Sequence, residues 1–159
     1  MSKSKRKWIN LDYSDTNNAL RAQDIPYDAS DSIKEAIDSA ATVSAGVAAS
    51  DETTALEVGD GVATFRVPCA MTLTDVRCSV GTAPVGSTII VDIEEGGSTV
   101  LSTLLTIDAG AKTSTTAAVP AVISDASLAD DAEITINIDQ VGSGTAGAGL
   151  KIWLIGTRT

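Results

Sequence analysis

The chain has 159 residues, of which 43% are hydrophobic and 3% aromatic, and it carries a net charge of -10 at pH 7. This length accommodates one ordinary domain with a short extension, and the scarcity of aromatic side chains disfavours a deep ligand pocket. Histidine is absent, which removes the commonest general base and the commonest metal ligand. We therefore expect a protein without enzymatic activity, bound cofactor or metal.

Basic residues are concentrated at the start of the chain. Lys3, Lys5, Arg6 and Lys7 contribute +4, so residues 8–159 carry a net charge of -14. A basic tip on an acidic body can dock on an acidic surface, or it can be a disordered terminus that keeps the chain soluble. The acidic body disfavours nucleic acid as a partner, because phosphate contacts need clustered Lys and Arg.

The sequence contains no sign of export or of a membrane partner. Residues 1–7 hold no apolar core of a signal peptide, and no apolar run reaches the roughly 18 residues that a membrane span requires. We expect synthesis in a cytoplasm. Cys69 and Cys78 have no zinc-ligand spacing; they can pair across neighbouring strands, or remain two small buried thiols.

Residues 1–29 are predicted to form an extended arm. The segment has no sustained periodicity, and an isolated arm of this kind cannot bury enough apolar surface to fold alone. Its large apolar residues therefore suggest that it becomes ordered against a partner, or else that it covers the chain's own body. Aromatic anchors bring much contact area at a low entropic cost. The apolar residues of the basic end are Trp8, Ile9, Leu11 and Tyr13.

Residues 30–41 are predicted to form a short helix. Ser32 and Glu35 have the spacing of a capping box, and one face carries a narrow apolar stripe of Ile33, Ala36, Ile37 and Ala40. A helix this short needs packing to be stable. Either it lies on the body of the protein, or helices from several copies meet around an axis.

Residues 42–55 have small side chains and weak preferences for helix or strand, and they are predicted to form a linker. From residue 56 the pattern has a period of two, with turns rich in Gly, Pro and Asp between segments. We expect seven or eight strands in residues 56–159, including a hairpin at 95–98 and a return strand over 99–107. Shorter strands are expected near 113–117 and 121–123. This pattern favours an all-β, antiparallel β-sandwich of the jelly-roll kind.

Paired carboxylates are the remaining residues that suggest chemistry. Asp92 and Glu94 share one face of a predicted strand, and Asp130, Asp131 and Glu133 precede another. Such groups can act as acid and base on a glycosidic bond or bind Ca²⁺, but solvated surface charge is the simpler interpretation. The glycine-rich segment 142–149 has no helix after it to hold a phosphate, so we interpret it as a flexible connection between strands.

Two stretches carry a resemblance to a known group of proteins. Asp24-Ile25-Pro26-Tyr27-Asp28 followed by residues 32–38 resembles a short motif of phage fibre and appendage proteins, where it commonly precedes a distal β module. Residues 86–156 are similar in pattern to a small β domain of phage structural proteins. The chain thus resembles virion structural proteins of tailed bacteriophages. It lacks their usual long shaft, which favours a compact knob.

The resemblance implies a trimeric head fibre or capsid decoration protein on the virion surface. The arm would anchor it to the major capsid protein or another virion protein, and Ile33 and Ile37 would lie around a threefold axis. The alternative is a tail fibre or receptor-binding module that recognises a host-surface glycan. Sugar-binding sites usually expose aromatic rings, whereas Phe65 and Trp153 lie in alternating strands where burial in the core is the default.

Overall fold

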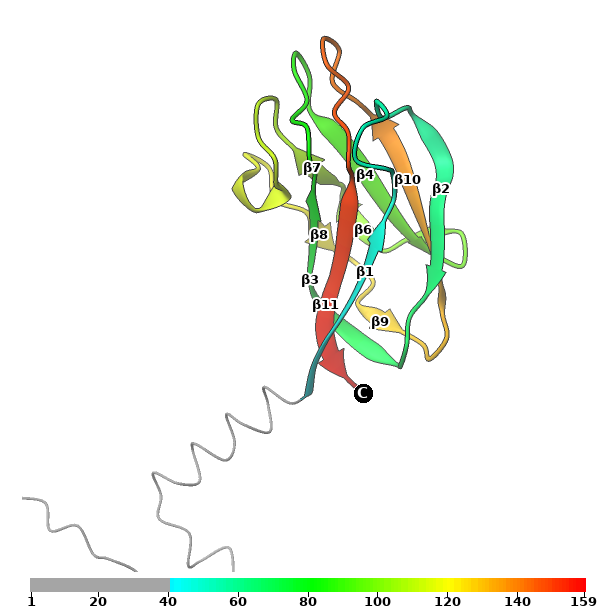
Figure 1. Cartoon of the computed structure of the whole chain (residues 1–159). Helices are drawn as coiled ribbons and strands as arrows, with labels where there is room; N and C mark the ends of the chain where they lie inside the picture. The colour runs from blue at the N-terminus through cyan, green and yellow to red at the C-terminus, as the bar shows by residue number, and fades with distance from the viewer. Residues whose placement is uncertain (1–40) are drawn as a thin grey trace, which may run out of the picture. The chain divides into compact units, whose positions relative to one another are not determined.

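In the computed structural model, the described residues are 41–159, and they form one antiparallel all-β sandwich (Figure 1). The first sheet has the strand order β1-β11-β3-β9, and the second has the order β2-β10-β4-β5, with β7 also paired to β4. A small third sheet pairs β6 with β8. The predicted fold class is confirmed. The predicted arm (1–29) and all but the last residue of the predicted helix (30–41) lie outside the described residues.

The strands follow the alternating segments of the sequence closely. Their bounds are β1 Thr42–Ala48, β2 Gly59–Arg66, β3 Met71–Ser79, β4 Ile89–Glu95, β5 Ser98–Thr99, β6 Leu101–Thr103, β7 Leu105–Ile107, β8 Val122–Ile123, β9 Ser127–Leu128, β10 Glu133–Gln140 and β11 Lys151–Arg158. The first four strands alternate between the two large sheets, and so do the last three. This connectivity is that of a double-sheet jelly roll, as the sequence predicts.

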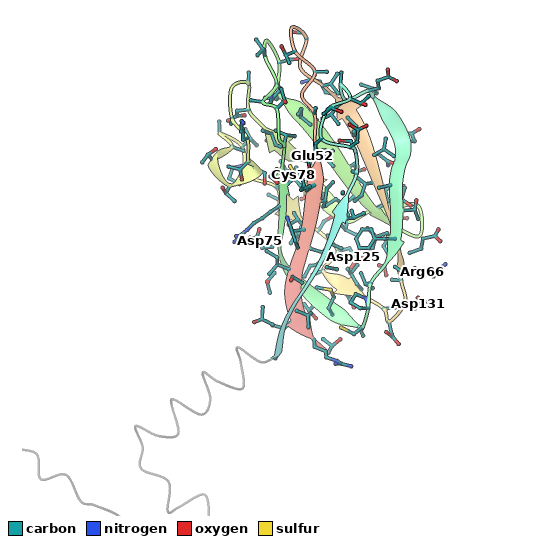
Figure 2. The ribbon with its side chains drawn as sticks, viewed as in Figure 1. Glu52, Arg66, Asp75, Cys78, Asp125 and Asp131 are labelled. Atoms are coloured by element: carbon teal, nitrogen blue, oxygen red, sulfur yellow. The ribbon has the colours of Figure 1, made fainter. Side chains whose placement is uncertain are left out.

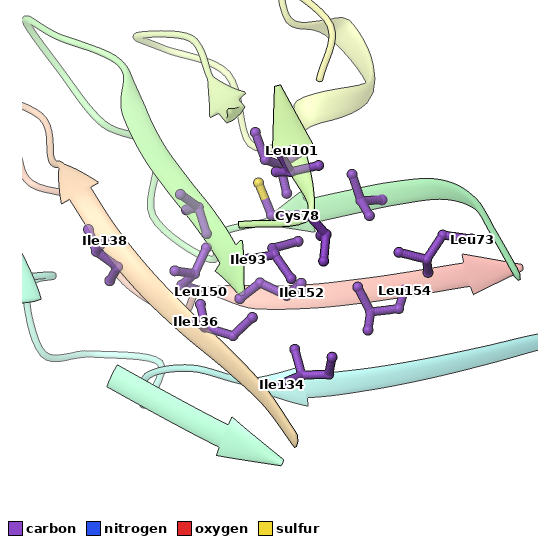
Figure 3. Packing of buried hydrophobic residues seen from close by; sticks show 14 of the residues in the cluster. Leu73, Cys78, Ile93, Leu101, Ile134, Ile136, Ile138, Leu150, Ile152 and Leu154 are labelled. Carbon is purple, nitrogen blue, oxygen red and sulfur yellow. The ribbon is translucent and has the colours of Figure 1, made fainter. Parts of the chain in front are cut away.

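The core lies between the two large sheets and is almost entirely aliphatic (Figure 3). Because side chains alternate across a strand, every second residue of β4, β10 and β11 points into it. Those residues are fully buried, and aromatic side chains contribute little volume there. The innermost positions are Ile89, Val91, Ile93, Ile134, Ile136, Ile138, Ile152 and Leu154.

Register shifts in β3 and β10 interrupt an alternation that the sequence pattern predicts to be continuous. In β3, Asp75 pairs with Ile155 and Leu73 with Gly156, so Thr74 is an extra residue and the inward positions shift by one. In β10 the register shifts beside Asn137, whose Oδ1 accepts a hydrogen bond from the Gly61 N–H at 2.7 Å. That bond satisfies a side chain only 7% exposed.

The prediction of a linker at 42–55 is wrong for its first half. Thr42–Ala48 form β1, which pairs with β11 over its whole length, and Val43 and Val47 pack against the core. The sandwich therefore begins at β1 and not at residue 56. The propensities of Ser, Ala and Gly are weak, but pairing with a distant strand and burial of two valines override them.

The return segment 99–107 is also less regular than predicted. The hairpin at 95–98 is confirmed: Gly96 and Gly97 have φ of 56° and 86°, as a tight primed turn requires. The chain then divides into β5 and β7, which both pair with β4, and β6 between them, which pairs with β8. The predicted strand near 113–117 is instead a 3₁₀ turn, η2 Ser114–Thr116.

The two ends of the sandwich differ. β1 starts beside the end of β11, since Thr42 pairs with Thr157, and Figure 1 shows the C-terminus at this end. At the opposite end three connections, 49–58, 80–88 and 141–150, are joined by backbone hydrogen bonds. These include Leu56 N to Gly147 O at 2.9 Å and Gly144 N to Val85 O at 2.8 Å. The glycine-rich connection is thus tied to its neighbours.

Candidate functional site

The residues predicted to anchor and to trimerise the protein lie outside the described residues. This holds for the basic tip, for the apolar residues of the arm and for the stripe of the predicted helix. These predictions therefore remain predictions. The residues concerned are Lys3, Lys5, Arg6, Lys7, Trp8, Ile9, Leu11, Tyr13, Ile33, Ala36, Ile37 and Ala40.

The sequence predicts that Trp153 is buried in the core, and this prediction is wrong. Ile152 and Leu154 point into the core, so the residue between them faces out, and Trp153 is 45% exposed. Phe65, by contrast, is partly buried and packs against the core. A tryptophan with so much of its surface in water places a large apolar group where a ligand can reach it.

The indole ring of Trp153 lies over a gap in the neighbouring strand. Gly46 is its cross-strand partner on β1, and a Cβ built on Gly46 would fall within 3.0 Å of three carbon atoms of the ring. A glycine at this position therefore lets the ring rest on the sheet. The other strand next to Trp153 supplies Arg77 as its partner.

An open groove of about 370 Å³ runs between Trp153 and the segment around η2. Trp153 and Ile155 form one side, Arg77 and Ser79 of β3 lie along it, and its far side consists of Thr113 and Thr115. We call this the Trp153 groove. The segment holding its far side is fixed to β3: the Val80 N–H donates to Lys112 O at 3.0 Å, and the Cys78 N–H donates to Ser114 Oγ at 2.9 Å.

A second groove of about 300 Å³ lies on the other side of Arg77. Asp75, Arg77 and Thr115 border it together with the apolar Leu105 and Pro120. The Arg77 Nε donates to Asp75 Oδ2 at 2.6 Å, and Figure 2 shows Asp75 on the outside of the sandwich. Both side chains are about half exposed, so this ion pair orients Arg77 more than it stabilises the fold.

One basic residue lines the Trp153 groove. Of the five Lys and Arg in residues 41–159, Arg77 lines the groove, Lys112 precedes the lining residue Thr113 in the chain, and Lys151 is the cross-strand partner of the lining residue Ser79. Lys151 forms an ion pair with Glu52. The guanidinium Nη atoms of Arg77 donate no hydrogen bond within the described residues.

The carboxylates singled out by the sequence lie on the outer surface of the second sheet or at its edge. Asp92 accepts hydrogen bonds from the Thr99 hydroxyl and, at 2.7 Å, from the Ile93 N–H. Asp131 and Glu133 form ion pairs with Arg66, and Figure 2 shows Arg66 and Asp131 near each other. Among the described residues, no group of His, Cys, Asp or Glu is arranged to hold a metal ion.

Two carboxylates have shifted pKa values. Hydrogen bonds from the Thr54 hydroxyl, and from the Thr54 and Thr53 backbone N–H groups, hold the pKa of Asp51 well below its usual range. Desolvation, together with the neighbouring carboxylates of Asp92 and Asp60, raises the pKa of Asp139.

Both cysteines are free thiols. Cys78 points into the core beside Leu101 (Figure 3), and burial raises the pKa of its thiol to about 12. Cys69 is only partly buried, so the expectation of two buried thiols holds for Cys78 alone. A thiol with so high a pKa is not a nucleophile near neutral pH.

Comparison with known proteins gives no relative: no family model, no curated protein and no solved structure matches the chain. Within residues 41–159, no helix is long and apolar enough to cross a membrane.

Proposed function

We propose that the chain is a non-enzymatic structural protein of a tailed-phage virion, a trimeric head fibre or capsid decoration protein. Its N-terminal arm attaches to the major capsid protein or another virion protein, the predicted helix joins three copies, and the sandwich projects from the particle surface.

The observation that carries this proposal is the polarity of the sandwich. The chain enters at Thr42, and the interlocked connections 49–58, 80–88 and 141–150 lie at the opposite end. A domain held through its N-terminal segment would therefore present that end outward. The basic residues and the large apolar residues of the arm sequence would supply the attachment with electrostatic and apolar contacts.

Deleting residues 2–22 tests the anchor. Particles assembled with the deletion variant should carry little or none of the protein, measured by quantitative gel or mass spectrometry of purified virions. A variant with Ser in place of Lys3, Lys5, Arg6 and Lys7 separates the charge from the apolar anchors, because it keeps Trp8. Undiminished occupancy of the deletion variant would refute the anchoring role.

The helix is tested in solution. Replacing both Ile33 and Ile37 by Asp should shift the mass from trimer towards monomer in light scattering, because two buried charges per chain cannot be accommodated at a threefold axis. A matched control replaces Lys34 and Asp38, on other faces of the same predicted helix, by Ala. A variant that stays trimeric would show that the helix does not hold the copies together.

The exposure of Trp153 favours a second candidate function, recognition of a host-surface glycan by a receptor-binding module. A ring 45% exposed beside a groove offers the stacking surface that such recognition uses. Binding of the full chain to a glycan array tests it. The two functions are compatible, because a projecting domain can also adhere.

A further inference from the structure

We propose that the Trp153 groove is a binding site for an acidic saccharide, a sugar ring bearing a carboxylate within an anionic surface polysaccharide. This inference rests on the second candidate function and gives it a site, a ligand class and a mode of recognition. It is independent of how the N-terminal arm attaches.

The indole ring of Trp153 is placed where a sugar ring can stack on it. Trp153 is at the centre of the outer face of the first sheet, between Gly46 on β1 and Arg77 on β3. Because the ring rests on Gly46, it is held before a ligand arrives, and little side-chain entropy remains to be lost on binding. A rigid aromatic surface suits the apolar C–H face of a pyranose ring.

The polar groups around the indole ring suit a sugar that bears a carboxylate. Ser79, Thr113 and Thr115 line the groove with hydroxyl groups, which both donate and accept hydrogen bonds and so match sugar hydroxyls. Arg77 uses its Nε for Asp75, which leaves both Nη groups for a ligand. A fork of two parallel N–H donors is the geometry that a carboxylate accepts.

Charge also favours an acidic group at Arg77. Within residues 41–159 there are 14 Asp and Glu, yet the residues that line this groove include the cation Arg77 and no carboxylate. The acidic side chains of the second sheet, such as Asp92 and Glu94, lie on the outer surface of the other layer. A carboxylate of a ligand is therefore accommodated better beside Arg77 than on the outer surface of the second sheet.

The same features favour a saccharide over a single-stranded nucleic acid, which also combines flat rings with negative charge. Nucleic-acid grooves use several aromatic residues for successive bases and a continuous basic track. Among the described residues, this groove is lined by one aromatic residue, Trp153, and one cation, Arg77. A site for one ring and one carboxylate fits it better.

The test measures binding of the full chain by isothermal titration calorimetry to two oligosaccharides of equal length, an oligogalacturonate and its neutral galactose counterpart. The wild-type chain should bind the acidic one more tightly, by about tenfold or more. Trp153→Ala should weaken binding of the acidic oligosaccharide by at least about tenfold, whereas Trp153→Phe should retain most of it because stacking persists.

Arg77→Gln should remove the preference for the acidic ligand and leave weak binding of the neutral one. Arg66→Gln is the matched control, because Arg66 is an exposed arginine that forms ion pairs on the second sheet; its affinity should equal that of the wild type. An oligodeoxythymidylate serves as the nucleic-acid probe. Circular dichroism of each variant shows whether the fold is intact.

Three results would overturn the inference. If an acidic glycan binds but folded Trp153→Ala and Arg77→Gln variants bind it equally well, the site is wrong while glycan recognition stands. If neither these oligosaccharides nor any glycan on the array binds, both the site and the second candidate function fail. Tighter binding of oligodeoxythymidylate than of any saccharide would assign the groove to nucleic acid. None of these results bears on incorporation into particles.

Discussion

The outer faces of the two large sheets differ, although their inner faces are built alike. Outside the first sheet lie Trp153, the Arg77–Asp75 pair and the groove. Outside the second lie several carboxylates, including Asp92 and Asp139. Both sheets turn Ile, Leu and Val inward. Packing of a jelly roll constrains the inward residues, so the outward residues are where recognition can be added without changing the fold.

The largest effect is expected from a substitution on the inner face of the second sheet. Ile136 is fully buried at the centre of β10, whereas its neighbour Thr135 faces outward. Ile136→Ala should lower the free energy of unfolding by about 2–5 kcal/mol, through lost burial and the cavity left behind. Thr135→Ala should change it by no more than about 0.5 kcal/mol. Urea denaturation measures both; equal losses would contradict the assignment of inner and outer positions.

The next effect concerns the first sheet's outer face alone. Gly46→Val places a branched side chain where the indole ring of Trp153 now lies, and it should cost about 1–3 kcal/mol by overpacking. In a Trp8→Phe background, the emission of Trp153 should also shift, because the ring must leave the sheet. The same substitution at Gly59, whose built Cβ meets only Val62 Cγ1 at 3.4 Å, is the control. An unchanged emission spectrum would show that the indole ring does not lie over Gly46.

A smaller effect is expected at the connection that follows β1. Because the pKa of Asp51 is lowered in the folded state, its charge stabilises the protein above the ordinary value of 3.8, and this contribution is lost as pH falls towards the folded pKa. Asp51→Asn should therefore be less stable than the wild type at pH 7. Urea midpoints of the two proteins should converge below pH 3.8; a constant difference would exclude the linkage.

The smallest effect is expected at Asp139, on the outer face of the second sheet. Asp139 has a raised pKa, so its ionisation opposes folding above that pKa, and the cost disappears below the ordinary value of 3.8. Asp139→Asn should be slightly more stable than the wild type at pH 7 and equal to it at pH 3. Asp130→Asn, in an exposed connection, is the control. Thermal melts at both pH values measure the difference. An Asp139→Asn variant less stable than the wild type at pH 7 would contradict the prediction.

Much of the fold could be predicted from the sequence because period-two segments such as Glu133–Gln140 bury one face completely. The errors arise where pairing with a strand far away in the sequence determines the secondary structure. Thr42–Ala48 has weak strand propensity and is a strand because β11, more than one hundred positions later, pairs with it. The bulge at Thr74 likewise depends on the partner strand.

The candidate site was only partly accessible to sequence reasoning. In Lys151–Arg158, inward Ile152 and Leu154 require Trp153 to face outward, so the signal was present in the alternation but conflicts with the general tendency of Trp to be buried. The groove itself could not be predicted, since Thr113 and Thr115 come from a 3₁₀ turn brought beside β3 by tertiary hydrogen bonds.

The pairing of β1 with β11 also determines how the domain carries a load. A pull on the chain at Thr42, along the strand direction, does not peel β1 away one residue at a time. It slides β1 along β11 and strains all seven residue pairs of their ladder together, because the hydrogen bonds run perpendicular to the strands. A sandwich pulled through its first strand therefore resists shear along that strand.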